Sequence, residues 1–136
     1  IPMVIFAMKR LDLIRKHPEY QEKLWEITRA LQNGLRESGF DIGPTNSPVT
    51  PVYMQGGVTE ATNLTADLRE NHNLFCSIVV YPVIPKGEII LRVIPTAAHT
   101  LEDVKYTIEA FKSVRDKLQS GFYRDKPIPE GLAQEL

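Results

Sequence analysis

One arginine, Arg92, lies within the aliphatic stretch EIILRVI that runs from residue 88 to 94. Successive side chains of a β-strand point to opposite faces, so Ile90, Arg92 and Ile94 would share one face. The residues of the other face, which we expect in the core, are Ile89, Leu91 and Val93. A guanidinium between two isoleucines can bind a carboxylate through two parallel hydrogen bonds while its neighbours shield the pair from water. The stretch therefore contains a candidate anion site.

Two interpretations of Arg92 stay open on these residues alone. In the structural interpretation, it is a surface arginine that pairs with Glu88 on the same face of the strand. In the functional interpretation, it anchors the carboxylate of a ligand. Composition favours the structural interpretation, because partnered charges also serve structure.

The segment YPVIPKG, which precedes this strand, is the second candidate. Its two prolines make it stiff, and its glycine permits a tight return of the chain. It is either a plain hairpin connection or a wall over a ligand that Arg92 holds. The residues of this loop that we single out are Tyr81, Pro82, Val83, Ile84, Pro85 and Gly87.

The other chemically capable residues favour structural roles. Cys76, the one cysteine, stands between apolar neighbours and has no activating base beside it. His99 lies just before a helix N-cap, where we expect it to satisfy the helix entry. His17 and His72 are far from it in sequence, so we predict no metal site and no nucleophile–base pair.

Composition places the chain among ordinary globular proteins. It has 136 residues, of which 43% are hydrophobic and 24% charged, with a net charge of −1. This balance gives no electrostatic case for nucleic acid or for an anionic membrane. No apolar run reaches the length of a membrane span, and the single cysteine suits a reducing compartment. We therefore expect a cytoplasmic protein.

Periodicity predicts the elements in the order α-α-β-α-β-β-α. The expected helices run from Pro2 to about Lys16, from Pro18 to a stop at Gly39, over 59–72 and over 101–118, and the expected strands cover 49–54, 74–81 and 88–95. A short connection between the last two strands predicts an antiparallel hairpin. The fold class is α+β: a two-layer domain with a small, largely antiparallel sheet and helices on one face.

The N-terminal half of the first helix, residues 3–8, is apolar on every side. Met3, Val4, Ile5 and Phe6 would surround it, and such a helix is normally buried. A domain of this size offers little room for that burial, so we expect the helix to pack on a larger body. We expect the chain to be a piece of a longer protein, with residues 1–17 as a linking helix, 18–119 as the domain and 120–136 as a flexible tail.

Taken as one ordered string, the chain resembles the C-terminal part of the pyridoxal-phosphate-dependent α-oxoamine synthases, which have the aspartate-aminotransferase fold type. The family pattern P-x-(V/T)-P-x-G, four residues, arginine and then A-x-H-T is matched in register by Pro82, Pro85, Gly87, Arg92, Ala97, His99 and Thr100. SPVTPVYM and KLWEITRALQNGLRESGFDIG also resemble family segments. The resemblance extends from residue 1 to about Leu118.

The resemblance implies a reaction and an architecture. The parent enzyme would condense glycine, serine or alanine with an acyl-CoA, releasing CoA and usually carbon dioxide, with pyridoxal 5′-phosphate as electron sink. It would be a homodimer, and a large domain before residue 1 would hold the cofactor and its Schiff-base lysine. This chain would be the small domain of a fold-type-I enzyme, without bound cofactor and inactive by itself.

The resemblance also implies roles for the two candidates. Arg92 matches the family arginine that binds the substrate carboxylate, and residues 81–87 match a loop near the acyl-chain entrance. Serine palmitoyltransferases often carry a second arginine where this chain has Val80. The loop looks closest to glycine C-acetyltransferase, also called 2-amino-3-ketobutyrate CoA ligase, with 8-amino-7-oxononanoate synthase as another option. The alternative to the family is a stand-alone α+β module that binds a carboxylate or mediates dimerisation.

Overall fold

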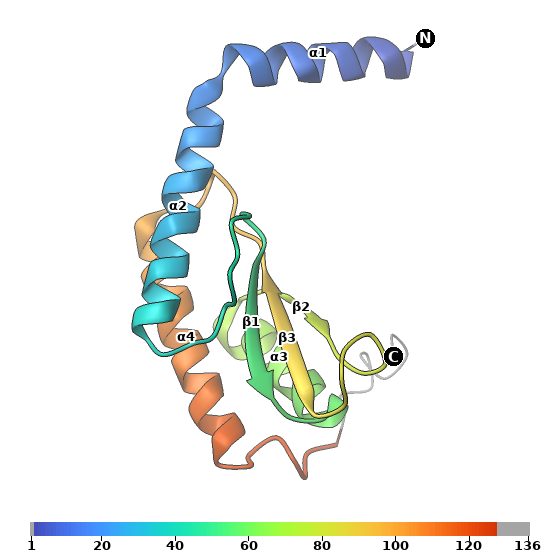
Figure 1. The fold of residues 1–136 in the computed structure, drawn as a ribbon, viewed down its shortest axis with the longest axis vertical. Helices are drawn as coiled ribbons and strands as arrows, with labels where there is room; N and C mark the ends of the chain where they lie inside the picture. The colour runs from blue at the N-terminus through green and yellow to red at the C-terminus, as the bar shows by residue number, and fades with distance from the viewer. Residues whose placement is uncertain (1, 128–136) are drawn as a thin grey trace.

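The structure, a computed structural model, describes residues 2–127 (Figure 1). Its elements follow the predicted order and are α1 (Pro2–Lys16), α2 (Pro18–Glu37), β1 (Thr50–Gln55), α3 (Val58–His72), β2 (Ser77–Val79), β3 (Glu88–Val93) and α4 (Leu101–Gln119). None of the described helices is long and apolar enough to cross a bilayer.

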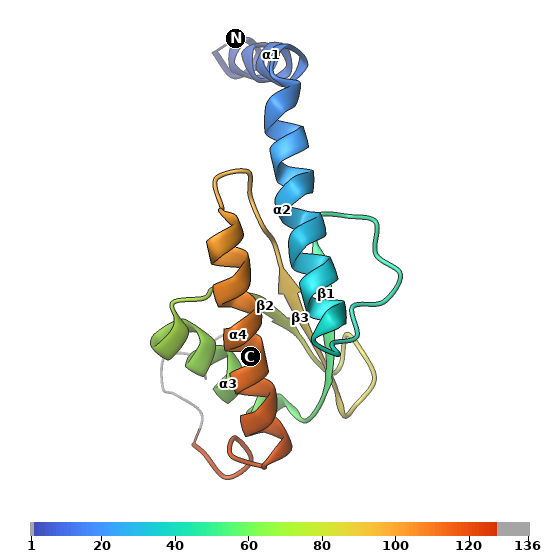
Figure 2. The ribbon, with the colours of Figure 1, turned by 90° about the vertical axis from the view of Figure 1, so that its left-hand side faces the viewer.

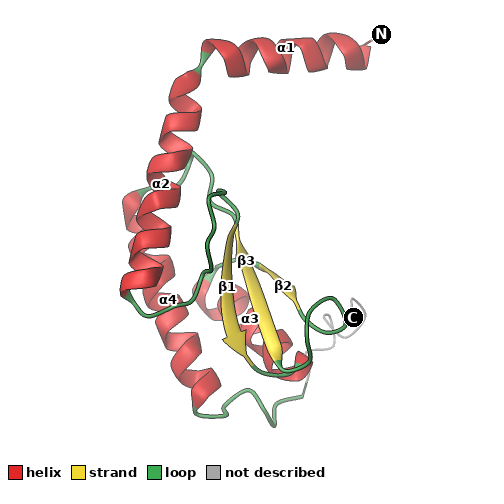
Figure 3. Ribbon diagram, in the orientation of Figure 1, coloured by secondary structure: helices red, strands yellow, loops and turns green. Residues whose placement is uncertain are grey.

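The three strands form one antiparallel sheet in the order β1-β3-β2, with β3 in the centre (Figure 3). The predicted hairpin is confirmed, because β2 pairs with β3 in antiparallel register. β2 is shorter than the expected strand 74–81 at both ends. At its C-terminal end the carbonyl of Val80 accepts the amide of Val83 and starts a turn. Pro51 lies on the edge strand β1, where its missing N–H costs no central ladder bond.

The helices cover one face of this sheet. In Figure 2, α3 and α4 lie in front of the sheet, and α2 packs beside α4. The predicted α+β architecture is confirmed, with one face of the sheet carrying no helix in the described part of the chain. The core contains the apolar stripes of three helices and the inner face of β3, namely Ile27, Leu31, Leu35, Ala61, Leu64, Leu68, Val104, Phe111, Leu118, Ile89 and Leu91. Leu101 and Tyr20 continue the helical spacing of two of these stripes, but they are exposed because they lie on the outermost turns of their helices.

Local signals fix where the helices begin and end. Thr100 caps α4: its hydroxyl accepts the amide of Asp103, and the Asp103 carboxylate accepts the amide of Thr100. Gly39 takes a positive φ of 78° just after α2, a conformation that glycine adopts without steric cost. Asn73 ends α3 in the left-handed region. These boundaries agree with the sequence predictions.

The first helix has no cover. Every residue of α1 is exposed, and within the described residues the first buried side chain is Ile27 of α2. Figures 1 and 2 show α1 running away from the domain, toward the side that the helix-free face of the sheet also faces. Its large apolar side chains, including Met3 at 83% exposure and Ile14 at 69%, therefore meet solvent in this chain alone.

A buried carboxylate ties the segment after α4 to the domain. Asp67 of α3 accepts hydrogen bonds from Lys117, from the Tyr123 hydroxyl and from Asn71. Burial alone would raise the pKa of Asp67, but these hydrogen bonds outweigh it and lower the pKa to about 2. Tyr123 lies in the segment expected to be a flexible tail and is nevertheless buried. Residues 128–136 of that expected tail lie outside the described residues.

Replacing Tyr123 with phenylalanine tests this tie, because the ring keeps its packing while the hydroxyl is lost. We expect Tyr123→Phe to lower the free energy of unfolding at pH 7 by about 1.5–3 kcal/mol, as for a hydrogen bond to a charged group. The folded-state pKa of Asp67 is below its ordinary value of 3.8, so this contribution is full above about pH 4 and disappears as the pH falls toward 2. Urea unfolding of both proteins at pH 7, 4 and 3 measures the difference.

The matched control is Tyr20→Phe, which removes a hydroxyl from an exposed tyrosine and should leave the unfolding free energy unchanged. Equal stability of the Tyr123→Phe variant and the parent at pH 7 would contradict the role given to the Asp67–Tyr123 bond.

Candidate functional site: the open face of the sheet

The face of the sheet opposite the helices, here called the open face, is built by alternation along the three strands. The register sets Val52, Met54, Ile89, Leu91 and Ile78 toward the core. The residues of the open face are Pro51, Tyr53 and Gln55 of β1, Glu88, Ile90 and Arg92 of β3, and Ser77 and Val79 of β2. All of them are half-buried or exposed. The predicted placement of Arg92 opposite the core is therefore confirmed.

Arg92 occupies the middle of this face. It stands directly between Pro51 of β1 and Ser77 of β2 in the strand register. Its Nε donates a hydrogen bond to the Ser77 hydroxyl at 3.0 Å. The structural interpretation that paired it with Glu88 is wrong, because no ion pair joins these two residues in the structure.

The charge of Arg92 is consequently free for an anion. Among the described residues, no carboxylate forms a salt bridge with its guanidinium. Half-buried Ile90 lies on one side of it along β3, whereas Ile94, 58% exposed, follows the end of β3 and lines a cavity on the helix side. A permanent cation with apolar neighbours is suited to binding a planar anion such as a carboxylate.

The loop of residues 81–87 joins β2 to β3 at the other end of the open face. Gly87 has a φ of 93°, and its carbonyl accepts the amide of Gly56, which fixes the return of the loop beside β1. Tyr81 and Val83 are 57% and 78% exposed, while Ile84 is half-buried. The loop ends at Gly87, five residues before Arg92, or about 17 Å along an extended strand. No hydrogen bond joins this loop to Arg92 among the described residues.

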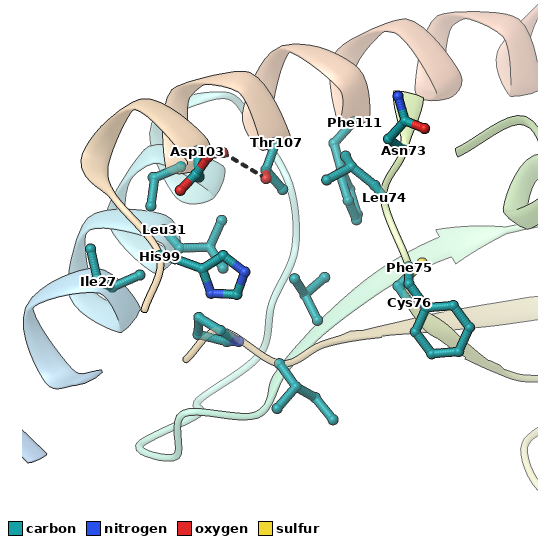
Figure 4. A pocket seen from close by; sticks show the side chains of 14 residues that line it. Ile27, Leu31, Asn73, Leu74, Phe75, Cys76, His99, Asp103, Thr107 and Phe111 are labelled. Atoms are coloured by element: carbon teal, nitrogen blue, oxygen red, sulfur yellow. Dashed lines mark hydrogen bonds between the residues drawn. The ribbon is translucent and has the colours of Figure 1, made fainter. Parts of the chain in front are cut away.

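A separate cavity of about 290 Å³ lies on the helix side of the sheet, between α2, α4 and the end of β3 (Figure 4). Its apolar part includes Leu31, Leu74 and Phe111. Two of its polar side chains have partners: the Thr107 hydroxyl donates to the Asp103 carbonyl, and the Asp103 carboxylate accepts from Thr100.

His99 has the structural role that was expected near a helix entry, although its partner is the preceding turn. Its Nδ1 accepts the backbone amide of Thr96 at 2.9 Å. This bond closes the turn between β3 and α4, so that ring nitrogen is not available as a base.

Ser77 is the site residue that sequence reasoning missed. Alternation alone places Ser77 on the face opposite Cys76 and Ile78, which is the face of Arg92. Its exact partner could not be read from the sequence, because the eight residues between β2 and β3 allow several registers. With the register known, the serine directly opposite Arg92 would have been identified as its hydrogen-bond partner.

Comparison with known proteins identifies long relatives of this short chain. It is 53% identical over 126 residues to a cysteate-C-fatty acyltransferase from Capnocytophaga ochracea, covering 91% of this chain and 30% of the relative. It is 35% identical over 119 residues to an 8-amino-7-oxononanoate synthase from Exiguobacterium sibiricum, covering 87% of this chain and 30% of the relative. The chain thus spans about 30% of the length of these relatives. No family model matches it.

A solved structure has the same fold. A serine palmitoyltransferase from S. paucimobilis, with bound pyridoxal phosphate and myriocin, superposes with a TM-score of 0.68 at 24% identity, covering 79% of this chain and 27% of that one. The similarity shows that the chain has the fold of the matching part of that pyridoxal-phosphate-bound enzyme.

The thiol beside the cavity gives a test of this packing. Cys76 is buried, and burial raises the pKa of its thiol from 9.0 to about 11. Because the thiolate is the reactive form, we expect alkylation by iodoacetamide at pH 8 to be at least about 100-fold slower in the native chain than in urea. Cys76 is the one thiol in the sequence, so mass spectrometry reads a single site. Native and unfolded rates that agree would contradict the buried position.

Proposed function

We propose that this chain, a C-terminal small domain of the pyridoxal-phosphate-dependent α-oxoamine synthase family, supplies the substrate-carboxylate anchor of a fatty-acyl-CoA-dependent enzyme. The observation that carries the proposal is Arg92, a cation without a carboxylate partner among the described residues, at the centre of the open face. The expected residues Tyr81, Pro82, Val83, Ile84, Pro85 and Gly87 form the wall toward the acyl chain.

The amino-acid and acyl substrates are proposed from the relatives. The identity of 53% to a cysteate-C-fatty acyltransferase exceeds the 35% to an 8-amino-7-oxononanoate synthase, which supports cysteate as the amino acid and a fatty acyl group as the donor. The reaction joins the α-carbon of the amino acid to the thioester carbonyl, releases CoA as the thiol and loses the carboxylate as carbon dioxide. We therefore propose cysteate in place of glycine, serine or alanine, the amino acids that the family resemblance implied.

The free energy that Arg92 contributes to binding a carboxylate depends on how well the pair is sheltered from water. An ion pair exposed to water is worth about 0–1 kcal/mol, which is too little to hold an amino acid. A hydrogen bond to a charged group that is sheltered from water contributes about 1.5–3 kcal/mol. Arg92 is exposed in this chain, so its carboxylate site needs a further wall to exclude water. We propose that the rest of the enzyme covers the open face and completes this site.

Enzymes of this family use pyridoxal phosphate, and the described residues do not fit that cofactor by themselves. A Schiff-base site needs a lysine aimed into a pocket, and the open face carries none. Several lysines elsewhere are paired with carboxylates, namely Lys16, Lys23, Lys112 and Lys117. We propose that the cofactor site belongs to a large domain outside this chain.

The exposed α1 supports the same organisation. We propose that residues 1–17 link the domain 18–119 to the large domain, whose surface covers the apolar side chains that α1 exposes here, and that the whole enzyme is a homodimer. The uncovered helix and the uncovered sheet face lie on the same side of the chain, so a single neighbouring body can cover both (Figure 1).

The role of Arg92 is tested in the enzyme that contains this chain. We expect Arg92→Ala to raise the KM for the amino acid at least about tenfold, because two charge-assisted hydrogen bonds to the carboxylate are lost. The amino-acid KM of Arg92→Lys should fall between those of the parent and of Arg92→Ala, since lysine keeps the charge but cannot form two parallel hydrogen bonds. Steady-state kinetics with cysteate and a fatty acyl-CoA measures the KM of each variant.

Arg69→Ala is the matched control. Arg69 is an exposed arginine on α3, on the opposite side of the sheet, and its ion pair is with the adjacent Glu70. We expect this variant to have the kinetics of the parent. An unchanged amino-acid KM in Arg92→Ala, with cysteate and with serine, would rule out the carboxylate role.

The chain alone gives a second test of the cofactor assignment. We expect no imine absorbance band after addition of pyridoxal phosphate beyond that of free surface lysines, and no release of CoA from acyl-CoA with any amino acid. Ultraviolet–visible spectra and a thiol assay measure these two quantities. A saturable band at one equivalent of cofactor would show that the Schiff-base lysine lies within this chain.

A further inference from the structure

Ser77 is the one residue of the open face that holds the guanidinium of Arg92. The two residues are direct partners across β2 and β3, and the Nε–H of Arg92 donates to the Ser77 hydroxyl at 3.0 Å. On the other side, the partner across β1 is Pro51, which has no polar side chain to offer. The guanidinium is therefore drawn toward β2.

The position of this bond on the guanidinium decides which edge is left for a ligand. An arginine presents five N–H donors, and a carboxylate can bind through the two terminal nitrogens or through Nε and one terminal nitrogen. Ser77 already accepts the Nε–H, which blocks the second of these modes. The edge formed by Nη1 and Nη2 stays open, and it is the farther edge from the strand backbone.

We infer that Ser77 is a positioning residue that fixes Arg92 so that its terminal Nη1–Nη2 edge, and not its Nε edge, receives the substrate carboxylate. This inference rests on the proposed function of Arg92. A long side chain on an exposed face has many rotamers, and the Ser77 hydroxyl is the one acceptor that the guanidinium has among the described side chains. The Ser77 hydroxyl selects among these rotamers before the substrate arrives, which lowers the cost of ordering the side chain on binding.

Two variants separate positioning from packing. In the enzyme that contains this chain, we expect Ser77→Ala to raise the amino-acid KM by about threefold to tenfold, the range for losing one ordinary hydrogen bond. The kcat and the KM for acyl-CoA should change less than twofold. Ser77→Thr keeps the hydroxyl on a residue that strands favour, and it should restore the amino-acid KM to within about twofold of the parent. Ser120→Ala, at the end of α4, is the control for loss of a serine hydroxyl.

A spectroscopic measurement on this chain does not depend on catalysis. The Nε–H of Arg92 should exchange with water more slowly than that of exposed Arg36, whose Nε has no hydrogen bond to another described side chain. Ser77→Ala should abolish this difference, while Ser77→Thr preserves it. Nitrogen-edited NMR of the arginine side chains reads the exchange, and the backbone amide spectrum verifies that each variant is folded.

The outcomes distinguish the inference from the proposed function. If Arg92→Ala raises the amino-acid KM and Ser77→Ala does not, the proposed function stands and the positioning role is overturned. Equal KM values for Ser77→Ala and Ser77→Thr would also overturn it, since the hydroxyl would then be irrelevant. If Arg92→Ala leaves the KM unchanged while Ser77→Ala alters the Nε–H exchange, the hydrogen bond is real, and the proposed function fails and the inference with it.

Discussion

The pairing of β3 with strands on both of its sides is the constraint on which the rest of this domain depends. Because β1 and β2 hold the central strand in antiparallel register, its side chains have no freedom to change faces. Ile89 and Leu91 are completely buried against the helices, and a shift by one residue would expose both. The same pairing directs Arg92 to the open face and places Ser77 directly opposite it. The burial of two aliphatic residues thus fixes the position of a charge.

The two sides of the domain differ in burial: one is covered by helices, and the other leaves apolar side chains exposed. Its helix-covered side contains a continuous core and the buried Asp67, Lys117 and Tyr123 tie. Its other side presents the open face, the loop of residues 81–87 and the apolar helix α1. Apolar surface on this scale is typical of an interaction site. The chain spans about 30% of the length of these relatives, which agrees with a neighbouring body on that side.

Much of this arrangement could be predicted from the sequence, because it follows from local rules. Pro18, Gly39 and the Thr100–Asp103 pair mark helix ends, and alternation around Arg92 assigns the two faces of β3. The length of β2 could not be predicted, since it depends on the turn that Val80 forms with Val83. The Asp67–Tyr123 bond joins residues 56 positions apart, and no periodic pattern reports such a contact. Predicting the partner of Arg92 requires the register of β2 against β3, which the sequence of the proline-rich loop does not determine.

The central claim is that the open face of this sheet meets the carboxylate of an amino-acid substrate through Arg92. A crystal structure of the enzyme that contains this chain, with cysteate bound, measures it directly. The account predicts two carboxylate oxygens at about 2.7–2.9 Å from Nη1 and Nη2 of Arg92. It also predicts that the Nε–H still donates to Ser77 and that another domain covers the open face. A carboxylate held by other residues, with the guanidinium of Arg92 left in solvent, would contradict the account.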